Sequence, residues 1–304
     1  LSGENVKFLI DGIPVVGRLN GNIDLNQLNL FNVDHVEIIE GPMSVIYGSN
    51  AIAGVVNIIT KENRNSATSA YASTYLESVG VYNFNAGASV RRKKNNFSLD
   101  LARNFFDGYT TADSLRSMQW KPRLQYNADA YYLYSGAKTR IKLSVQFFDE
   151  TIQDKGDLQK PYYETAIDNY FHTIRQTSKA EASYTISEFR QISMVGAYST
   201  YLRKREVYQN DLTVLEKQLA GGDTTNVGSY LLRAWYNRNY ANQKLNYQVG
   251  FDGNLEVNEG QRIEGGTQQI GDYAGFISLK YNLFRQLSLQ PGARFIYNTK
   301  YNAP

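Results

Sequence analysis

The chain has 304 residues, a net charge of only +3 from 32 basic and 29 acidic residues, and no cysteine. This small charge gives no reason to expect a nucleic-acid partner, and the absence of cysteine excludes disulfides and thiolate metal sites. No stretch approaches the roughly 18 apolar residues of a membrane helix, so a helical membrane protein is excluded. A transmembrane β-barrel is not excluded, because only every second side chain of its strands faces the lipid. The 24 tyrosines and the polar mean hydropathy of −0.45 suit that setting.

The first sixty residues contain short apolar runs separated by glycine, proline and asparagine. The runs at 6–10, 36–39 and 55–59 predict short buried strands of a compact α/β domain. Asp11 and Gly12 form a turn pair, because glycine readily adopts a positive φ angle.

From residue 66 onwards the pattern changes to long segments of strict alternation. In the segment 243–258 the odd positions are mostly apolar and the even positions mostly polar. Neighbouring side chains of a strand point to opposite faces, so each such segment predicts a strand with one apolar and one polar face. We predict about eleven strands of this kind. Sixteen residues also exceed the usual strand of about 5–6 and suit a strand that crosses a membrane.

The connections between these segments alternate between tight and long. The tight ones are expected at 92–95, 135–138, 187–189, 241–243 and 284–286. Long loops are expected near 106–119, 149–172, 204–227 and 259–269. Outer-membrane barrels have short periplasmic turns and long outer loops, so loop length predicts which end faces outwards.

Two stretches of the first domain carry a family resemblance, NVKFLIDGIPV at 5–15 and IDLNQLNLFNVDHVEIIEGPMSVIYGSNAIAGVVNIITK at 23–61. They resemble the C-terminal half of the plug domain of TonB-dependent receptors. The motif positions are Asp11, Gly12, Glu37, Gly41, Pro42, Tyr47, Gly48 and Asn57. The resemblance implies that residues 1–64 are the C-terminal part of a plug. Residues 65–304 would then be the first half of a mostly β fold, a transmembrane antiparallel barrel of about 22 strands when complete.

The chain departs from the family pattern at three positions, His35, Glu40 and Ala53. Two of them replace basic residues that would pair with the barrel wall. Glu37 remains, and we expect that inward-facing Arg or Lys of the barrel could pair with it.

The resemblance also implies a location and a function. The location is the outer membrane of a Gram-negative bacterium, in contact with its lipids. The function is uptake of a scarce large nutrient, namely cobalamin, haem or a ferric siderophore. TonB would contact a box upstream of Leu1. One alternative is a plugged signalling receptor or a docking partner of a surface lipoprotein, without transport. Another is a passive porin, which the plug sequence argues against.

The candidate ligand residues lie in one plug segment and two outer loops. They are Arg18, Asn20 and Asn22 in the segment 15–22, Tyr162 and Tyr163 in the loop 149–172, and Tyr208 in the loop 204–227. The segment 15–22 could equally be a plain surface turn. The last loop also brings Arg203, Lys204 and Arg205, which could meet an anionic ligand.

Carboxylates cluster in the loop 149–172, and they could either hold Ca²⁺ or simply solvate the loop. They are Asp149, Glu150, Asp154, Asp157 and Asp168. The metal question therefore stays open, and no cofactor is expected.

An enzymatic function has little support in the sequence. His35 and His172 each stand without metal-ligand spacing, and no nucleophile elbow or phosphate loop occurs. The basic cluster 91–94 lies in a predicted tight turn without an aromatic platform. Contact with anionic headgroups or with solvent accounts for it better than nucleic acid does.

Overall fold

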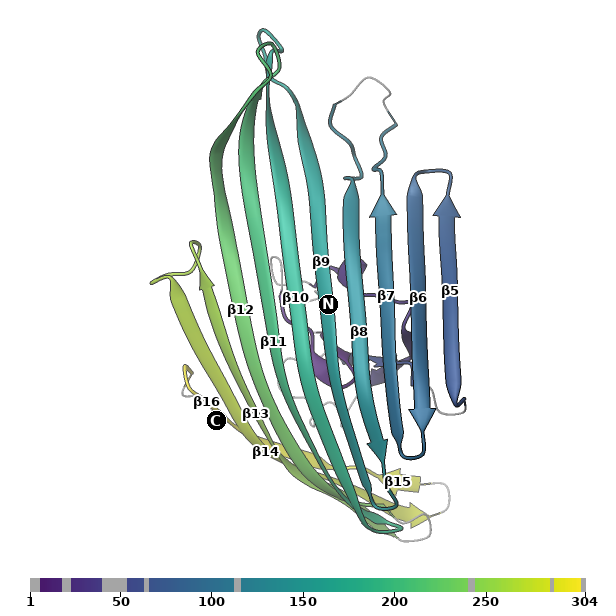
Figure 1. Cartoon of the computed structure of the whole chain (residues 1–304). Coiled ribbons are helices and arrows are strands. Elements are labelled where there is room, and N and C mark those ends of the chain that lie inside the picture. The colour runs from purple at the N-terminus through teal and green to yellow at the C-terminus, as the bar shows by residue number, and fades with distance from the viewer. Residues whose placement is uncertain are drawn as a thin grey trace.

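The computed structural model describes residues 6–17, 23–39, 54–62, 66–111, 116–239, 244–284 and 287–301. These residues form two sheets. A small four-stranded sheet, called the plug below, packs against one face of a large antiparallel sheet, called the wall (Figure 1). The predicted boundary between residues 64 and 65 lies outside the described residues.

The plug consists of β1 (Lys7–Ile10), β2 (Ile13–Pro14), β3 (Val33–Ile39) and β4 (Val55–Thr60), in the order β2-β1-β4-β3. Strand β1 runs parallel to β4, while the β1–β2 and β3–β4 pairs are antiparallel. A 3-10 helix, η2 (Leu25–Gln27), begins at Asp24, whose carboxylate accepts a hydrogen bond from the Asn26 backbone N–H. Within the described part of the plug this turn is the one helical element, so the expected α component is not seen there.

The wall follows chain order, each strand from β5 to β14 pairing with the next, while β15 and β16 both pair with β14. Its strands are β5 (Thr68–Glu77), β6 (Val81–Arg92), β7 (Asn95–Phe106), β8 (Arg123–Ser135), β9 (Thr139–Leu158), β10 (Thr165–Ser187), β11 (Arg190–Asp211), β12 (Glu216–Arg238), β13 (Leu245–Gly260), β14 (Thr267–Phe284), β15 (Leu287–Leu289) and β16 (Gly292–Asn298). The wall is an open part of a barrel, because β5 pairs only with β6 and the other edge is formed by β15 and β16.

Strands β15 and β16 are two parts of one crossing strand. Both pair with β14, and the register is continuous from Leu289 opposite Tyr281 to Gly292 opposite Ser278. The interruption falls at Pro291, which has no N–H to donate to the ladder. Counted in this way, the described wall has the eleven strands that alternation predicts.

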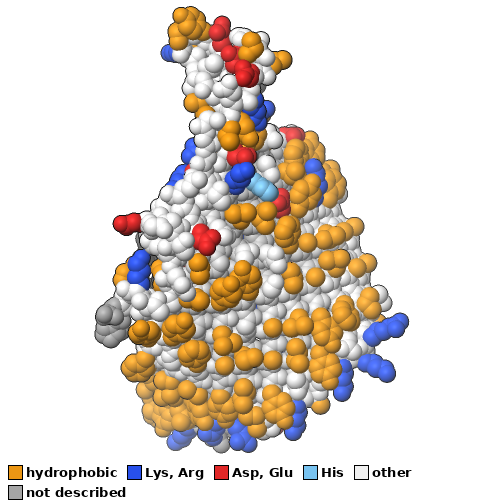
Figure 2. Space-filling view, turned by 60° about the vertical axis from the view of Figure 1, so that its left-hand side comes forward, with side chains coloured by type: hydrophobic (Ala, Val, Ile, Leu, Met, Phe, Trp, Pro, Cys, Tyr) orange, Lys and Arg blue, Asp and Glu red, His pale blue; other side chains and the backbone are white. Residues whose placement is uncertain are grey.

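The predicted alternation of side chains is confirmed. In β13 the side chains of Val249 and Phe251 are exposed on the outer face, while Asn246 and Asp252 are buried on the side of the plug. Figure 2 shows the result as a broad band of apolar side chains over the outer face of the wall. In the described residues no helix is long or apolar enough to cross a membrane.

The prediction of long outer loops is wrong for two of the four connections, 149–172 and 204–227. Strands β9 to β12 continue through most of these two ranges, and the turns occupy only 159–164 and 212–215. The loop expected at 259–269 is present at 261–266. The ladder between β10 and β11 extends to Thr165 opposite Asp211, which satisfies the backbone hydrogen bonds by pairing. The β9–β10 and β11–β12 hairpins therefore project far beyond their neighbours (Figure 1). Only 107–122 is a long loop, with 112–115 outside the described residues.

The tight turns lie at the opposite end of the wall, as predicted. Turns follow β6, β8 and β10 at the expected places. Residues 241–243 and 285–286 lie outside the described residues.

Two small apolar clusters join the plug to the wall. Ile13 packs with Val195 and Leu231, and Val16 packs with Tyr201 and Val227. These contacts seat the start of the segment 15–22 directly against β11 and β12.

Candidate functional site

The described plug motif residues converge on the side chain of Asn57. Its Oδ1 accepts a hydrogen bond from the Gly12 N–H at 2.9 Å, and its Nδ2 donates to Glu37 Oε2 at 2.8 Å. The Asp11-Gly12 pair forms the predicted turn, with φ angles of 47° and 78°. Asp11 also accepts from the N–H and the hydroxyl of Thr60, both at 2.8 Å. The motif thus ties the β1–β2 hairpin to β4 and β3.

Glu37 does not follow the expectation of a basic partner from the barrel. Its described contacts are with Asn57 and with His35, whose Nε2 lies 3.6 Å from Glu37 Oε1. The reason is register, because Glu37 lies directly opposite Asn57 in the β3–β4 pair. Gly41, Pro42, Tyr47 and Gly48 of the motif lie outside the described residues.

Two other plug carboxylates make ion pairs with the wall, and we call this set the ionic contact. Glu62 Oε1 accepts hydrogen bonds from Arg140 Nη2 at 2.7 Å and from Lys142 Nζ at 2.8 Å. Asp11 Oδ2 lies 3.4 Å from Lys179 Nζ and 3.9 Å from Lys142 Nζ. Both lysine side chains and both carboxylates are largely buried, whereas Arg140 is partly exposed.

The ionic contact holds both plug carboxylates in their charged form. Burial alone would raise the pKa of Asp11, but Lys179, Lys142 and the Thr60 hydrogen bonds outweigh it, and the pKa lies below its ordinary 3.8. Burial opposes ionisation of Glu62 in the same way. Its hydrogen bond to Lys142 and the charges of Lys142 and Arg140 lower the pKa below 4.5.

A second set of contacts lies further towards the long hairpins, and we call it the amide network. Glu150 is fully buried, and its two oxygens accept from Gln27 Nε2 and Gln125 Nε2, both at 2.7 Å. Arg175 donates to Gln27 Oε1 at 2.8 Å and to the Val16 carbonyl at 3.0 Å. Gln27 therefore joins one anion and one cation of the wall through a single amide.

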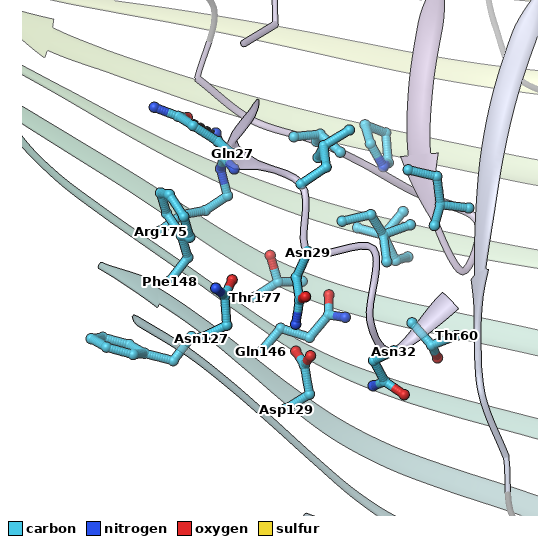
Figure 3. Close-up of a pocket in the computed structure, with 17 residues that line it drawn as sticks. Gln27, Asn29, Asn32, Thr60, Asn127, Asp129, Gln146, Phe148, Arg175 and Thr177 are labelled. Carbon is cyan, nitrogen blue, oxygen red and sulfur yellow. Dashed lines mark hydrogen bonds between the residues drawn. The ribbon is translucent and has the colours of Figure 1, made fainter. Parts of the chain in front are cut away.

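Below the amide network a cavity of about 60 Å³ lies between plug and wall. Asn29 and Asn32 of the plug line it opposite Asn127, Asp129 and Gln146 of the wall (Figure 3). This volume accommodates a few waters but not a large nutrient.

Two arginines of β11, Arg203 and Arg205, lie on the wall above the plug. Tyr201 of β11 packs against Gly17, where an added Cβ would lie 2.2 Å from the tyrosine ring. Because side chains alternate, Arg203 and Arg205 share the face of Tyr201, about 7 and 14 Å further along the strand. Arg203 lies over the Phe171 ring at 4.7 Å, and Arg205 donates to Asn169 Oδ1 at 2.8 Å and lies 3.8 Å from Asp223.

The structure separates the predicted ligand residues. Arg18, Asn20 and Asn22 lie outside the described residues, although Gly17 places the start of their segment below Arg203. Tyr162 and Tyr163 are exposed at the tip of the β9–β10 hairpin, with Tyr162 at 78%.

Tyr208 and Lys204 lie on the opposite face of β11 from Arg203. Tyr208 makes an edge contact with Tyr170 at 5.6 Å, and Lys217 Nζ lies 3.9 Å from the Tyr208 ring centre. A ligand-binding role for the three tyrosines stays a prediction.

The clustered carboxylates of β9 and β10 have separate partners. His172 bonds Asp149 at 2.8 Å, Lys121 pairs with Asp154 at 2.6 Å, and Arg116 Nη2 donates to Asp168 Oδ2 at 2.6 Å. In the part of the chain that the structure describes, no group of three or more His, Asp or Glu is placed to hold a metal ion.

Sequence reasoning missed Gln27, Gln125 and Arg175, and it assigned Glu150 to a loop. Gln125 and Arg175 could have been found as polar residues at plug-facing positions of alternating strands. Gln27 has no local signal, because its partner Glu150 is 123 residues away in the sequence.

The family-model match falls on the N-terminal part of the chain, and the curated relatives match over short segments. Residues 1–55 match the TonB-dependent Receptor Plug Domain family model. The vitamin B12 transporter BtuB of Vibrio cholerae serotype O1 is 45% identical over 60 residues, which is 20% of this chain and 10% of that protein. The BtuB of Vibrio vulnificus is 38% identical over 65 residues, 21% of this chain and 11% of that protein.

The structural comparisons cover nearly the whole chain. A mutant of the ferric enterobactin receptor PfeA from Pseudomonas aeruginosa gives a TM-score of 0.73 at 16% identity, covering 97% of this chain and 50% of that one. The siderophore receptor PirA of Acinetobacter baumannii gives 0.71 at 16% identity, with 98% and 49% covered. At this identity the likeness shows the fold. The chain spans about half the length of these receptors, and its matches to the curated relatives cover about a tenth of their length.

Proposed function

This chain belongs to the TonB-dependent receptors, and we propose that it serves TonB-energised uptake of a large anionic metal chelate, a ferric siderophore, across the outer membrane of a Gram-negative bacterium. The plug seated in the wall supports a gated receptor rather than an open pore. The apolar band on the outer face of the wall supports a location in the outer membrane (Figure 2).

The observation that carries the choice of ligand is the pair Arg203 and Arg205 above the plug. Both are on the face that leads down to the plug contact of Tyr201, and Arg203 is backed by an aromatic ring. Guanidinium groups bind anionic oxygens with directed hydrogen bonds, and an aromatic ring stacks on planar catechol-type groups. The solved receptors that share the fold have names that refer to ferric enterobactin and siderophores.

The test is binding of ferric enterobactin to the complete purified receptor, followed by intrinsic fluorescence quenching. Arg203→Gln combined with Arg205→Gln is expected to weaken binding by at least about tenfold, since hydrogen bonds to charged groups are the strong ones. Lys204→Gln is the matched control, because it removes a cation from the opposite face of the same strand. Equal loss in the control, or no loss in the double variant, contradicts the proposal.

Cobalamin is the second candidate, and the 45% identity with vitamin B12 transporters favours it. That identity covers only 60 residues, so it bears on a fifth of the chain. Titration with cyanocobalamin in the same assay separates the two. Tight binding of cobalamin that is unchanged in the double arginine variant would favour this candidate over the chelate.

Docking of a surface lipoprotein is a third candidate, and the tips of the long hairpins favour it. Val214, Leu215 and Leu219 are exposed there, with Leu215 at 84%. The Leu212 N–H of this hairpin donates to the Glu164 carbonyl of the neighbouring one at 2.8 Å, and Figure 2 shows apolar side chains at the projecting tip. Exposed apolar patches of this kind mark interaction surfaces. Substitution of Leu215 by Ser should then abolish uptake while leaving ligand binding intact, as measured by radiolabelled transport.

A further inference from the structure

On the outer face of the wall, two arginines, Arg190 and Arg238, lie next to each other near the tight turns. Two rows of outward side chains follow from the strand registers. In the first, Ile192 lies opposite Tyr184 on one side and Tyr236 on the other. In the next row, two residues nearer the turns, Arg190 lies opposite Arg238. Positions two apart on a strand are about 7 Å apart, so the arginines lie just past the apolar band.

The two arginines face outwards and not towards the plug. Arg190 lies an even number of positions from Ile192 and Met194 on β11, and Arg238 an even number from Leu232 on β12, so each arginine shares the face of these residues. Ile192, Met194 and Leu232 are exposed. Arg233, of the other parity, is buried. The pair is therefore on the face of the barrel that the apolar band covers.

A direct cross-strand pair of like charges is destabilising by itself. The described contacts orient the two side chains: Arg190 Nε donates to Ser187 Oγ at 3.1 Å, and the Arg238 guanidinium lies 5.9 Å from the Tyr247 ring centre. An anion shared between the guanidinium groups would turn the repulsion of the pair into two charge-assisted hydrogen bonds.

The surroundings of the pair are basic. Arg92, Lys93, Lys94 and Lys138 are exposed in the neighbouring tight turns, and Figure 2 shows Lys and Arg along the lower rim of the apolar band. Among the described turn residues 92–95, 135–138 and 187–190, Glu188 is the single acid. The hairpin tips at the opposite end carry both signs, with Lys160 and Glu164 in one turn and Arg262 and Glu264 in another.

We propose that Arg190 and Arg238 bind the phosphodiester headgroup of an anionic phospholipid in the leaflet at the tight-turn end. The acyl chains of this lipid lie over the row of Tyr184, Ile192 and Tyr236. Lipid is the occupant because the guanidinium pair and the apolar row are continuous on one face, and a soluble anion uses only the former. The site depends on the barrel spanning a membrane and not on which ligand the receptor transports.

The test is native mass spectrometry of the complete receptor, delipidated in detergent and titrated with phosphatidylglycerol or phosphatidylcholine. The wild type is expected to retain phosphatidylglycerol about tenfold better, because basic residues at a membrane surface favour anionic lipid. Arg190→Gln combined with Arg238→Gln removes this preference. Lys204→Gln combined with Arg262→Gln, two cations of the long hairpins, leaves it unchanged.

Three results would overturn the proposal. They are equal retention of both lipids by the wild type, a preference that persists in the arginine double variant, and displacement of phosphatidylglycerol by inorganic phosphate alone. The last result would assign the pair to a soluble anion. If the double variant does not fold, the single variants decide, since each should reduce the preference in part. Binding of ferric enterobactin is measured on the same samples, so failure of this site and failure of the proposed function are told apart.

Discussion

The plug meets the wall through two zones that use different chemistry. The ionic contact near the tight turns joins carboxylates to lysines and an arginine, as in Glu62 with Lys142 at 2.8 Å. The amide network, further out, centres on Gln27, which bonds both Glu150 and Arg175. An amide needs defined geometry at each atom, whereas an ion pair tolerates displacement. The amide network therefore fixes the position of the plug, and the ionic contact holds it by charge that protons can weaken.

The largest effect is expected from Glu150→Ala in the amide network. It removes the acceptor of Gln27 Nε2 and one of the two acceptors of Gln125 Nε2, and it leaves the buried cation of Arg175 in place. Removing one partner of a buried charged network costs about 3–5 kcal/mol. The measurement is the urea concentration at which trypsin cleaves the plug while the barrel stays folded. Glu164→Ala, at an exposed turn, is the control, and an equal shift in the control would break the comparison.

Lys142→Met should have a smaller effect, about 2–3 kcal/mol in the same assay, because the ionic contact is redundant. Glu62 keeps Arg140, and Asp11 keeps Lys179. Lys138→Met, an exposed lysine at the start of the same strand pair, should be neutral. A loss from Lys142→Met as large as that from Glu150→Ala would show that the two zones are equivalent.

Gly17→Ala tests whether the amide network depends on close approach of the backbone. Gly17 has a φ angle of +90°, and an added Cβ would lie 2.2 Å from the Tyr201 ring. Overpacking and a left-handed backbone together cost about 2 kcal/mol. Gly221→Ala has open space around its Cβ and serves as the control. Unchanged urea resistance of the Gly17 variant would mean that plug and wall adjust freely at this point.

Acid should weaken the ionic contact, with the smallest effect of the four. The folded-state pKa values of Asp11 and Glu62 are lowered, so their contribution to stability is fully present above the ordinary values of 3.8 and 4.5. It is lost as pH falls below these values through the lowered ones. The urea midpoint for plug release should thus decline below about pH 5, and less steeply in Lys142→Met. A decline of equal slope in both proteins would place the titrating groups elsewhere.

Local chemistry explains which features could be predicted from the sequence. The Asp11-Gly12 turn follows from two adjacent residues, and the outward side chains of β13 follow from a period of two. The paired ends of β10 and β11 were expected to be loops, because beyond the membrane both faces are polar and the alternation disappears. The partners of Gln27 could not be predicted, because its hydrogen bonds join it to Glu150 and Arg175, more than 100 positions away in the sequence. The ligand role of Arg203 and Arg205 stays a proposal.

The plug, up to Glu62, is expected to close the complete barrel from within through these two zones. The most direct test is ion conductance of the complete receptor in a planar lipid bilayer. We expect the wild type to stay closed, and Glu150→Ala to open at lower urea concentration than the wild type and to close again when urea is removed. A steady open conductance of the wild-type receptor without urea would contradict the account.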